Sequence, residues 1–368
     1  MKFLVITQKV NKNDSNLGFF CSWLQKLSSK TDYLYVACLN EEEHSLDTTK
    51  VTVKSVSKGP ARESKNLWQT IKKFIALRKI IKSFGSEYDA VFIHMVPEYT
   101  LLRPIFWRRK HKKILLWYTH KSVTIWLRLA NLIVNKIFTA SKESYRLANK
   151  KVEVSGHGIE IERFARPVGP VRNSNELRLL AVGRTSPVKD LETVIQGLNE
   201  LCKRLLNKNI NPDNLINLTI IGKPLTEESN AYQNRLNQLV RQSGLSWHIN
   251  FTGGFPHSEM PLQYQRHDIL IHTSQTGSMD KVVLEALAAG LIVVTSSEAY
   301  ADLADGELKN VLFKFPLGDY QELAKTIEKI YKNDILNTIP NQRGIDYVRK
   351  QHNLDNLVSK IIGYFKSV

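Results

Sequence analysis

The chain has 368 residues, of which 42% are hydrophobic and 24% are charged, a composition typical of a globular protein with a sizeable core. No run of 18 uncharged apolar residues occurs, so we expect no membrane-spanning helix. The cysteines Cys21, Cys38 and Cys202 lie far apart and show no metal-binding spacing, which indicates reduced thiols in a reducing compartment.

The formal net charge of +17 is concentrated in the N-terminal part of the chain. Residues 1–150 contain 27 Lys and Arg against 11 Asp and Glu, whereas residues 151–368 contain 25 against 24. This difference predicts two domains with different partners. The basic part is suited to a polyanion, either nucleic acid or an anionic lipid surface.

In chain order, short apolar runs alternate with helical patterns, which predicts parallel sheets covered by helices on both faces. In the first part we predict helices at 19–27 and 67–84 and strands at Lys2–Thr7, Tyr33–Cys38, Val51–Val56, Asp89–His94, Lys113–Trp117 and Lys136–Thr139. After a linker-like stretch at Phe164–Asn175, the pattern restarts. Here we predict helices at 191–206, 231–243 and 353–368 and strands at Leu177–Val182, Asn217–Ile221, His248–Phe251, Asp268–His272 and Ile292–Thr295.

The stretch Ala181–Asp190, AVGRTSPVKD, follows the first strand of the second part. Gly183 lets the chain turn sharply and come close to a ligand. Arg184 and Lys189 place two cations at the carboxyl end of the strand, and a guanidinium fork with a mobile ammonium suits a diphosphate. A surface turn with two solvated cations would show the same spacing, so both interpretations stay open.

The stretch Thr276–Gly290, TGSMDKVVLEALAAG, places Gly277 and Ser278 before a strongly helical run. Free backbone N–H groups at such a helix start can bind an anion, and Glu285 lies one to two turns further, where it could reach ribose hydroxyls. The alternative is a core helix with Ser278 as its N-cap and Glu285 as a surface acid.

Taken together, the motifs resemble those of the retaining glycosyltransferases of family 4, which have the GT-B architecture. The resemblance covers nearly the whole chain through short pieces in a fixed order: the Gly18 loop, SKES at Ser141–Ser144, GHGIEIERF at Gly156–Phe164, VGRTSPVK, FTGGFPH at Phe251–His257 and LEALAAG. It implies an α/β fold of two Rossmann-like domains facing across a cleft, with a C-terminal helix that returns to the N-terminal domain. The implied domains are an acceptor-side domain, 1–168 with the helix at about 353–368, and a nucleotide-sugar donor domain, 169–352.

The resemblance also implies roles for individual residues. Arg184 and Lys189 would bind the donor diphosphate and act in catalysis with His120, which resembles the family's histidine beside the reacting sugar. The resemblance implies further donor-binding residues in the Gly18 loop and around the phosphates, the base and the ribose of the donor. They are Gly18, Gly183, Gly222, Lys223, Phe255, Ser278, Met279, Asp280, Lys281, Val282 and Glu285.

One departure from the family pattern concerns the donor sugar. The first acid of the family's paired-glutamate motif would fall at Gly277, and Asp280 is a nearby substitute for it. In the implied mechanism the acceptor hydroxyl attacks on the face that the diphosphate leaves, and Arg184, Lys189 and the helix amides stabilise the leaving group. We expect no metal and no further cofactor, because these cations offset the phosphate charge.

Three histidines, His94, His157 and His272, lie near predicted strand ends, and a structural role is favoured over a catalytic one for each. The segment HMVPEY, with His94, Glu98 and Tyr99, follows a strand of the basic domain, so we expect it to line the acceptor pocket.

The basic part contains an amphipathic pattern at Leu67–Phe84 and a second cluster, RPIFWRRKHKK, at Arg103–Lys113. Cations beside Phe106 and Trp107 suit an anionic bilayer surface, although Leu67–Phe84 is equally compatible with a sheet-covering helix whose lysines meet water. No nucleic-acid-binding motif is present, so we expect membrane association and no nucleic-acid partner.

The sequence therefore predicts a peripheral enzyme at the cytoplasmic face of the cell membrane. It would move a sugar from a nucleoside-diphosphate sugar to a lipid-linked or glycan acceptor in polysaccharide or glycolipid synthesis. Two alternatives stay open: a nucleotide-sugar epimerase of the same fold, and a non-catalytic module that binds membranes or polyanions.

Overall fold

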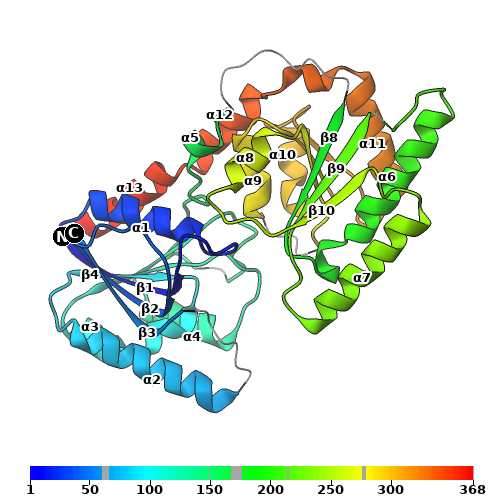
Figure 1. Ribbon diagram of the computed structural model, residues 1–368. Coiled ribbons are helices and arrows are strands. Elements are labelled where there is room, and N and C mark those ends of the chain that lie inside the picture. Colours follow the sequence, from blue (N-terminus) through cyan, green and yellow to red (C-terminus); the bar gives the residue numbers. More distant parts are fainter. Residues whose placement is uncertain (60–65, 148, 167–175, 214, 276–278, 368) are drawn as a thin grey trace. The chain divides into compact units, whose positions relative to one another are not determined.

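The computed structural model describes residues 1–59, 66–147, 149–166, 176–213, 215–275 and 279–367. The chain divides into two compact units (Figure 1). The first unit comprises Met1–Gly158, Pro256–Ser258 and His352–Val368, and the second comprises Ile159–Phe255 and Glu259–Gln351. The predicted boundary between residues 168 and 169 lies outside the described residues.

A seven-stranded parallel sheet forms the centre of the first unit, in the order β3-β2-β1-β4-β5-β6-β7. Its strands are β1 (Lys2–Val10), β2 (Tyr33–Glu41), β3 (Val51–Lys58), β4 (Ala90–His94), β5 (Lys113–Trp117), β6 (Lys136–Thr139) and β7 (Val152–Val154). Successive residues of β1 alternate between two hydrophobic cores, since Phe3 and Val5 belong to one and Leu4 and Ile6 to the other. Both faces of the sheet are therefore buried, as predicted.

Different helices cover the two faces of this sheet. Helices α1 (Phe19–Ser29) and α13 (Leu354–Lys366) pack on the face of Phe3 and Val5. The opposite face is covered by α2 (Leu67–Ser83), the 3-10 helix η1 (Pro97–Leu101), α3 (Pro104–Arg109) and α4 (Ile125–Ile133). Over the described ranges, none of the helices has the length and apolarity required to cross a bilayer.

The structure corrects the placement of Trp107. Its side chain is fully buried and donates a hydrogen bond from Nε1 to the hydroxyl of Tyr88 at 2.9 Å. The prediction that Trp107 lies at a bilayer surface is therefore wrong, because this ring fills the core beneath α3. The guanidinium of Arg103 does lie over the half-buried Phe106 ring, 3.6 Å from its centroid.

The last helix, α13, belongs to the first unit although it follows the second unit in the chain. Phe365 meets Phe3 edge-on with ring centroids 4.9 Å apart, and Lys26 of α1 pairs with Asp355 at 3.0 Å. Most of the binding between α13 and the unit comes from its apolar face, because an exposed ion pair contributes less than about 1 kcal/mol.

The second unit contains a six-stranded parallel sheet in the order β10-β9-β8-β11-β12-β13. Its strands are β8 (Leu177–Val182), β9 (Ile216–Ile221), β10 (Ile249–Gly253), β11 (Ile269–His272), β12 (Ile292–Thr295) and β13 (Leu312–Lys314). In both sheets the chain starts in the middle, builds outward to one edge and then returns to build the other. This doubly wound order confirms the predicted α/β class.

Helices also cover both faces of the second sheet (Figure 1). One layer consists of α6 (Leu191–Leu206), α7 (Glu227–Gln242) and α11 (Tyr320–Lys332). The other consists of α5 (Ile161–Phe164), α8 (Met260–Gln265), α9 (Lys281–Ala288) and α12 (Gln342–Gln351). Two short segments, η2 (Pro187–Lys189) and α10 (Ala301–Asp305), follow β8 and β12.

His352 lies in the interior of the first unit, and in the chain it follows α12 and precedes α13. Its ring is 3% exposed, and Nδ1 accepts a hydrogen bond from the backbone N–H of His157 at 3.3 Å. Burial, together with the nearby charge of Lys360, lowers the pKa of His352 to about 4. The folded protein therefore holds this ring in its neutral form at neutral pH.

We predict that the first unit loses stability as the pH falls from 6.5 toward 4, because the unfolded chain then binds a proton that buried His352 does not. The loss attributable to this ring is about 3 kcal/mol at most. His352→Gln, which keeps a hydrogen-bond acceptor, should remove most of that loss, whereas the exposed His120→Gln should not. Urea unfolding followed by tryptophan fluorescence at pH 7 and pH 4.5 measures this, since five of the six tryptophans lie in the first unit.

Candidate functional site

The candidate site of the second unit lies at the carboxyl edge of its sheet, where the strand order reverses between β8 and β11. Open parallel sheets bind ligands at this position, because the connections after the two central strands diverge there. A small pocket at this edge is lined by residues of the turns that follow the central strands, among them Gly183, Lys189, His272 and Thr273.

The turns after β8 and β9 approach each other so closely that only glycine fits. A Cβ atom on Gly222 would lie 1.8 Å from the carbonyl oxygen of Gly183. Gly183 in turn packs beneath Lys189, whose Cε would lie 3.3 Å from an added Cβ. Close packing therefore explains the two predicted site glycines, and it lets the aliphatic part of Lys189 lie against the sheet edge.

Lys189 is fixed by the loop after β11. Thr273 Oγ1 donates to the carbonyl of Lys189 at 2.6 Å, and Gln275 N–H donates to the carbonyl of Val188 at 3.0 Å. The ammonium of Lys189 donates to Ser274 Oγ at 3.2 Å and pairs with Asp280 Oδ2 at 2.6 Å. Two of the three N–H donors of this ammonium are therefore assigned.

Asp280 also binds His272, the last residue of β11. His272 Nε2 lies 3.0 Å from Asp280 Oδ2, and His272 Nδ1 lies 2.9 Å from the hydroxyl of Thr295 at the end of β12. Burial opposes ionisation of Asp280, but the contacts from His272 and Lys189 outweigh it and hold the pKa of the carboxyl far below its usual range. Asp280 is therefore a carboxylate at every pH at which the protein is ordinarily handled.

Helix α9 begins at Lys281, directly after Asp280, and carries three more predicted site residues. Val282 is half-buried in its first turn, and burial lowers the pKa of Lys281 to about 7 despite the opposing charges of Glu285 and Glu160. Met279, just before the helix, is 6% exposed and belongs to the hydrophobic core. The predicted cap Ser278 and the departure at Gly277 lie outside the described residues.

Glu285 is buried at 6% exposure, and the hydroxyl of Tyr264 donates to its Oε2 at 2.9 Å. The alternative in which Glu285 is a surface acid is therefore wrong. A buried carboxylate needs such a partner, and α8 supplies it. Burial, together with proximity to the Glu285 carboxylate, raises the pKa of Tyr264 well above its ordinary value, which keeps this hydroxyl a donor.

Three predicted donor-binding side chains are more open. Arg184 and Lys223 are exposed, and Phe255 is half-buried against the core of the second unit. Over the part of the chain that the structure describes, no hydrogen bond or ion pair engages the Arg184 guanidinium. Its five donors are therefore available to a ligand, in contrast to the ammonium of Lys189.

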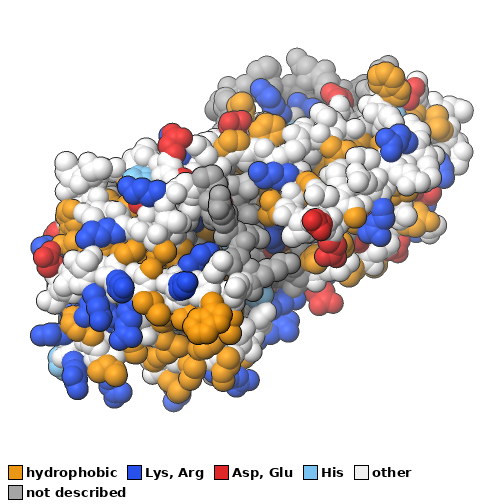
Figure 2. Space-filling view, turned by 60° about the horizontal axis from the view of Figure 1, so that its bottom comes forward, with side chains coloured by type: hydrophobic (Ala, Val, Ile, Leu, Met, Phe, Trp, Pro, Cys, Tyr) orange, Lys and Arg blue, Asp and Glu red, His pale blue; other side chains and the backbone are white. Residues whose placement is uncertain are grey.

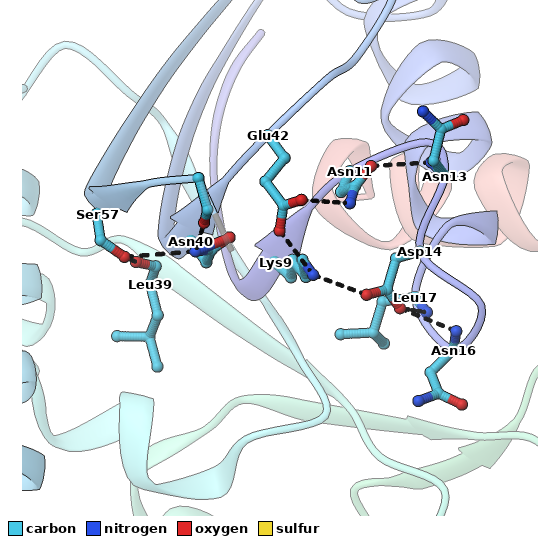
Figure 3. A network of polar contacts seen from close by, with 11 residues as sticks. Lys9, Asn11, Asn13, Asp14, Asn16, Leu17, Leu39, Asn40, Glu42 and Ser57 are labelled. Atoms are coloured by element: carbon cyan, nitrogen blue, oxygen red, sulfur yellow. Dashed lines mark hydrogen bonds and ion pairs between the residues drawn. The ribbon is translucent and has the colours of Figure 1, made fainter. Parts of the chain in front are cut away.

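In the first unit, the predicted glycine loop is held by a polar network at the end of β1 (Figure 3). Lys9 Nζ lies 2.8 Å from both Asp14 Oδ2 and Glu42 Oε1, and Asp14 Oδ1 accepts the backbone N–H groups of Asn16 and Leu17 at 2.9 and 2.7 Å. Burial disfavours the Lys9 ammonium, yet its two carboxylate partners raise its pKa. The loop is therefore braced by a half-buried charge cluster.

Gly18 ends this loop and is the N-cap of α1, with an ordinary helical backbone conformation. A Cβ here would lie 2.5 Å from the carbonyl oxygen of Asp14 and 2.8 Å from that of Lys12. Close packing of the loop on itself thus explains the glycine without a ligand. The predicted approach to a donor phosphate stays a prediction.

His120 follows β5 and is exposed. Its Nδ1 accepts a hydrogen bond from Ser122 N–H at 3.1 Å, so the neutral ring carries its proton on Nε2. In this tautomer Nε2–H is a donor that a hydroxyl oxygen can accept.

The acceptor-side residues differ in accessibility. His94 is 1% exposed, stacks on Phe20 at 3.9 Å between ring centroids, and lies 3.2 Å from the hydroxyl of Thr7 through Nδ1. Tyr99 is buried as well, and burial raises its pKa, whereas Glu98 is half-buried. These surroundings favour a structural role for His94 and Tyr99 and leave Glu98 as the more accessible of the three.

The sequence analysis placed His272 near a strand end but favoured a structural role for it, and it did not connect Ser274, Thr295 and Tyr264 with the site. A usable signal exists for two of them, because His272 and Thr295 are the last residues of predicted strands. In the sheet they are register partners on β11 and β12, and their side chains bond to each other. Tyr264 carries no such signal, since it lies within a short helix.

Comparison with solved structures identifies the class of fold. The chain superposes with a TM-score of 0.75 on Anabaena HepE in complex with UDP and glucose, at 16% identity and with full coverage of both chains. An E. coli trehalose-6-phosphate protein bound to UDP-2-fluoro glucose superposes with a TM-score of 0.76 at 11% identity. Sucrose-phosphate synthase from Thermosynechococcus elongatus superposes with a TM-score of 0.73 at 14% identity. In both comparisons at least 98% of each chain is covered. The fold is thus GT-B, as predicted.

A family model described as "Glycosyl transferases group 1" matches residues 165–350, about half of the chain. The chain therefore belongs to this glycosyltransferase family. Mannosylfructose-phosphate synthase from Agrobacterium fabrum is 24% identical over 201 residues, which are 53% of this chain and 43% of that protein. The chain thus matches less than half the length of this relative.

We predict that Gly222→Ala destabilises the second unit by at least about 2 kcal/mol, because the added Cβ would overlap the Gly183 carbonyl and displace the β8 turn. The matched control is Gly254→Ala, directly after the last residue of β10, where an added Cβ meets only Lys223 at an ordinary 3.5 Å. Scanning calorimetry of both variants measures the effect. Equal melting temperatures would contradict the steric argument.

Proposed function

We propose that this protein transfers a sugar from a nucleoside-diphosphate sugar to an acceptor hydroxyl with retention of configuration at the sugar. The observation that carries the proposal is the pair of cations at the reversal of strand order, where Lys189 is anchored and Arg184 is open. These two side chains would bind the diphosphate and stabilise its charge as the sugar departs. No divalent metal is required in this proposal, since the cations offset that charge.

UDP-sugars are the first donors to test. The Anabaena protein was solved with UDP and glucose, and the E. coli protein with UDP-2-fluoro glucose, which supports a uridine nucleotide here. In the proposal Glu285 contacts the ribose, Phe255 with Gly222 and Lys223 borders the base, and Met279–Val282 supply backbone amides to the phosphates. Gly18 and His120 of the first unit would serve the donor phosphate and the reacting sugar.

We predict that Arg184→Ala and Lys189→Ala each lower kcat/KM at least about a hundredfold, the effect expected when a preorganised charge at a leaving group is removed. The matched control is Lys203→Ala, which removes an exposed cation from α6 of the same unit. Release of nucleotide from UDP-, GDP- and ADP-sugars measures turnover, and melting temperatures confirm folding. Normal turnover in the Arg184 variant would contradict the proposal, and no nucleotide release by the native protein would favour a non-catalytic module.

We further propose that the acceptor is lipid-linked or a growing glycan, and that the protein works at the cytoplasmic face of an anionic membrane. Helices α2, α3 and α4, which cover the same sheet face, contain eight Lys and Arg and no Asp or Glu. Large apolar side chains are exposed on all three, including Trp68 at 71%, Ile105 at 69% and Leu132 at 78%. Figure 2 shows hydrophobic and basic side chains gathered together on this side of the first unit.

This composition fits a bilayer surface better than water alone. Each basic residue near an anionic surface contributes about 1 kcal/mol, and exposed tryptophans are suited to the headgroup region. Trp126 of α4 is 43% exposed and adds a second aromatic side chain to the face. A nucleic acid would use the same charge but gives no reason for the exposed aliphatic residues.

We predict that the protein floats with phosphatidylglycerol vesicles, not with phosphatidylcholine vesicles, and that 0.5 M salt weakens the binding, because most of the attraction is electrostatic. The double variant Trp68→Ala/Trp126→Ala should reduce binding at least about tenfold. Trp247→Ala is the matched control, since that side chain is 95% exposed on the second unit. Binding that ignores lipid charge and salt would refute the membrane proposal.

A further inference from the structure

The Asp280 carboxylate is held rigidly beside Lys189. Its Oδ2 atom lies 2.6 Å from Lys189 Nζ and 3.0 Å from His272 Nε2, and its own carbonyl accepts a hydrogen bond from the Tyr300 hydroxyl at 3.1 Å. Tyr300 and His272 are both buried. The carboxylate is thus fixed by partners from β11 and from the segment after β12.

Asp280 is the N-cap residue of α9, but its side chain makes no capping hydrogen bond. Two other N-cap aspartates of the same unit do cap their helices: Asp190 binds Thr193 N–H, and Asp319 binds Glu322 N–H at 2.9 Å. Capping by aspartate ordinarily stabilises a helix. The Asp280 carboxylate is directed instead at Lys189, so its position serves the site and not the helix end.

This arrangement places a permanent anion on the ammonium to which the proposed function assigns the donor diphosphate. A carboxylate and a phosphate that share one cation repel each other, and the repulsion is much stronger at a partly buried sheet edge than in water. Lys189 and Asp280 are each about one-fifth exposed, so solvent does not screen the pair fully. The diphosphate therefore meets a lysine whose charge is already largely compensated.

We propose that Asp280 is a resident counter-ion of Lys189 that weakens the binding of the nucleoside diphosphate and thereby speeds its release after sugar transfer. The inference rests on the proposed function and adds a regulatory role at the same site. This role differs from the sequence-based hypothesis, in which Asp280 substitutes for the missing acid and holds the donor sugar, because the Oδ2 atom of Asp280 is bonded to Lys189 and His272.

The test is Asp280→Asn, which removes the charge and keeps the size of the side chain. We expect calorimetric titration to show UDP and inorganic pyrophosphate bound about tenfold more tightly, a difference of about 1.4 kcal/mol, with binding of uridine unchanged. In steady-state assays with the donor that the native protein turns over, the donor KM and kcat should both fall, and inhibition by the product diphosphate should become stronger.

Two controls separate charge from structure. Asp280→Glu keeps the charge and should bind UDP within about threefold of the native protein, and Asp319→Asn removes a capping carboxylate remote from Lys189 and should have no effect on affinity. Melting temperatures are measured for each variant. If Asp280→Asn does not fold, Asp280→Ser replaces it, with the same expected tightening.

Weaker or unchanged binding of UDP and pyrophosphate by Asp280→Asn would overturn the counter-ion role and assign Asp280 a positioning or purely structural role. Equal tightening by Asp280→Glu would also overturn it, because the charge would then not be the cause. Failure of the proposed function is a different result: the native protein would bind none of UDP, GDP, ADP or pyrophosphate in the same titrations.

Discussion

The chemistry of the second unit depends on how two neighbouring turns are joined at the reversal of strand order. The chain leaves β8 and β11 toward different parts of the sheet, yet Thr273 and Gln275 bond back to the carbonyls of Lys189 and Val188. The backbone approach of Gly183 and Gly222 closes the turn from the other side. Without these contacts Lys189 would lie on a solvated loop, and its ammonium would not be directed at the sheet edge.

Much of the fold could be predicted because buried parallel strands are continuous apolar runs, and all eleven predicted strands are present. The two strands that were missed, β7 (Val152–Val154) and β13 (Leu312–Lys314), have three residues each and lie at sheet edges. Such segments bury little apolar surface, and a neighbouring strand stabilises them more than their own sequence does. Tertiary pairing is therefore the information that the sequence pattern lacks.

In the candidate site, too, local sequence predicts some features and tertiary pairing decides the others. The sequence predicts Arg184 and Lys189 correctly at the carboxyl edge of the sheet, because both residues directly follow a predicted strand. The bond between Lys189 and Asp280 joins residues 91 positions apart and requires β8 and β11 to be neighbours, which no local pattern specifies. The burial of Glu285 likewise depends on Tyr264, a partner that another helix supplies.

The unequal charge of the two units fits the two kinds of anion that we propose as partners, a diphosphate for the second unit and a membrane surface for the first. A diphosphate is small and compact, so a few cations with fixed directions suffice to bind it, and nearby carboxylates can tune the affinity. The second unit contains nearly equal numbers of cationic and anionic side chains, which fits such a ligand. A membrane surface is extended and presents no fixed geometry, so many cations without ordered partners are suitable, together with apolar side chains that enter the headgroup region. Helices α2 to α4 contain no acidic residue. A helix that only covers a sheet has no need of this absence, whereas it favours binding to an extended anionic surface. The charge distribution is therefore better explained by two anionic partners than by one.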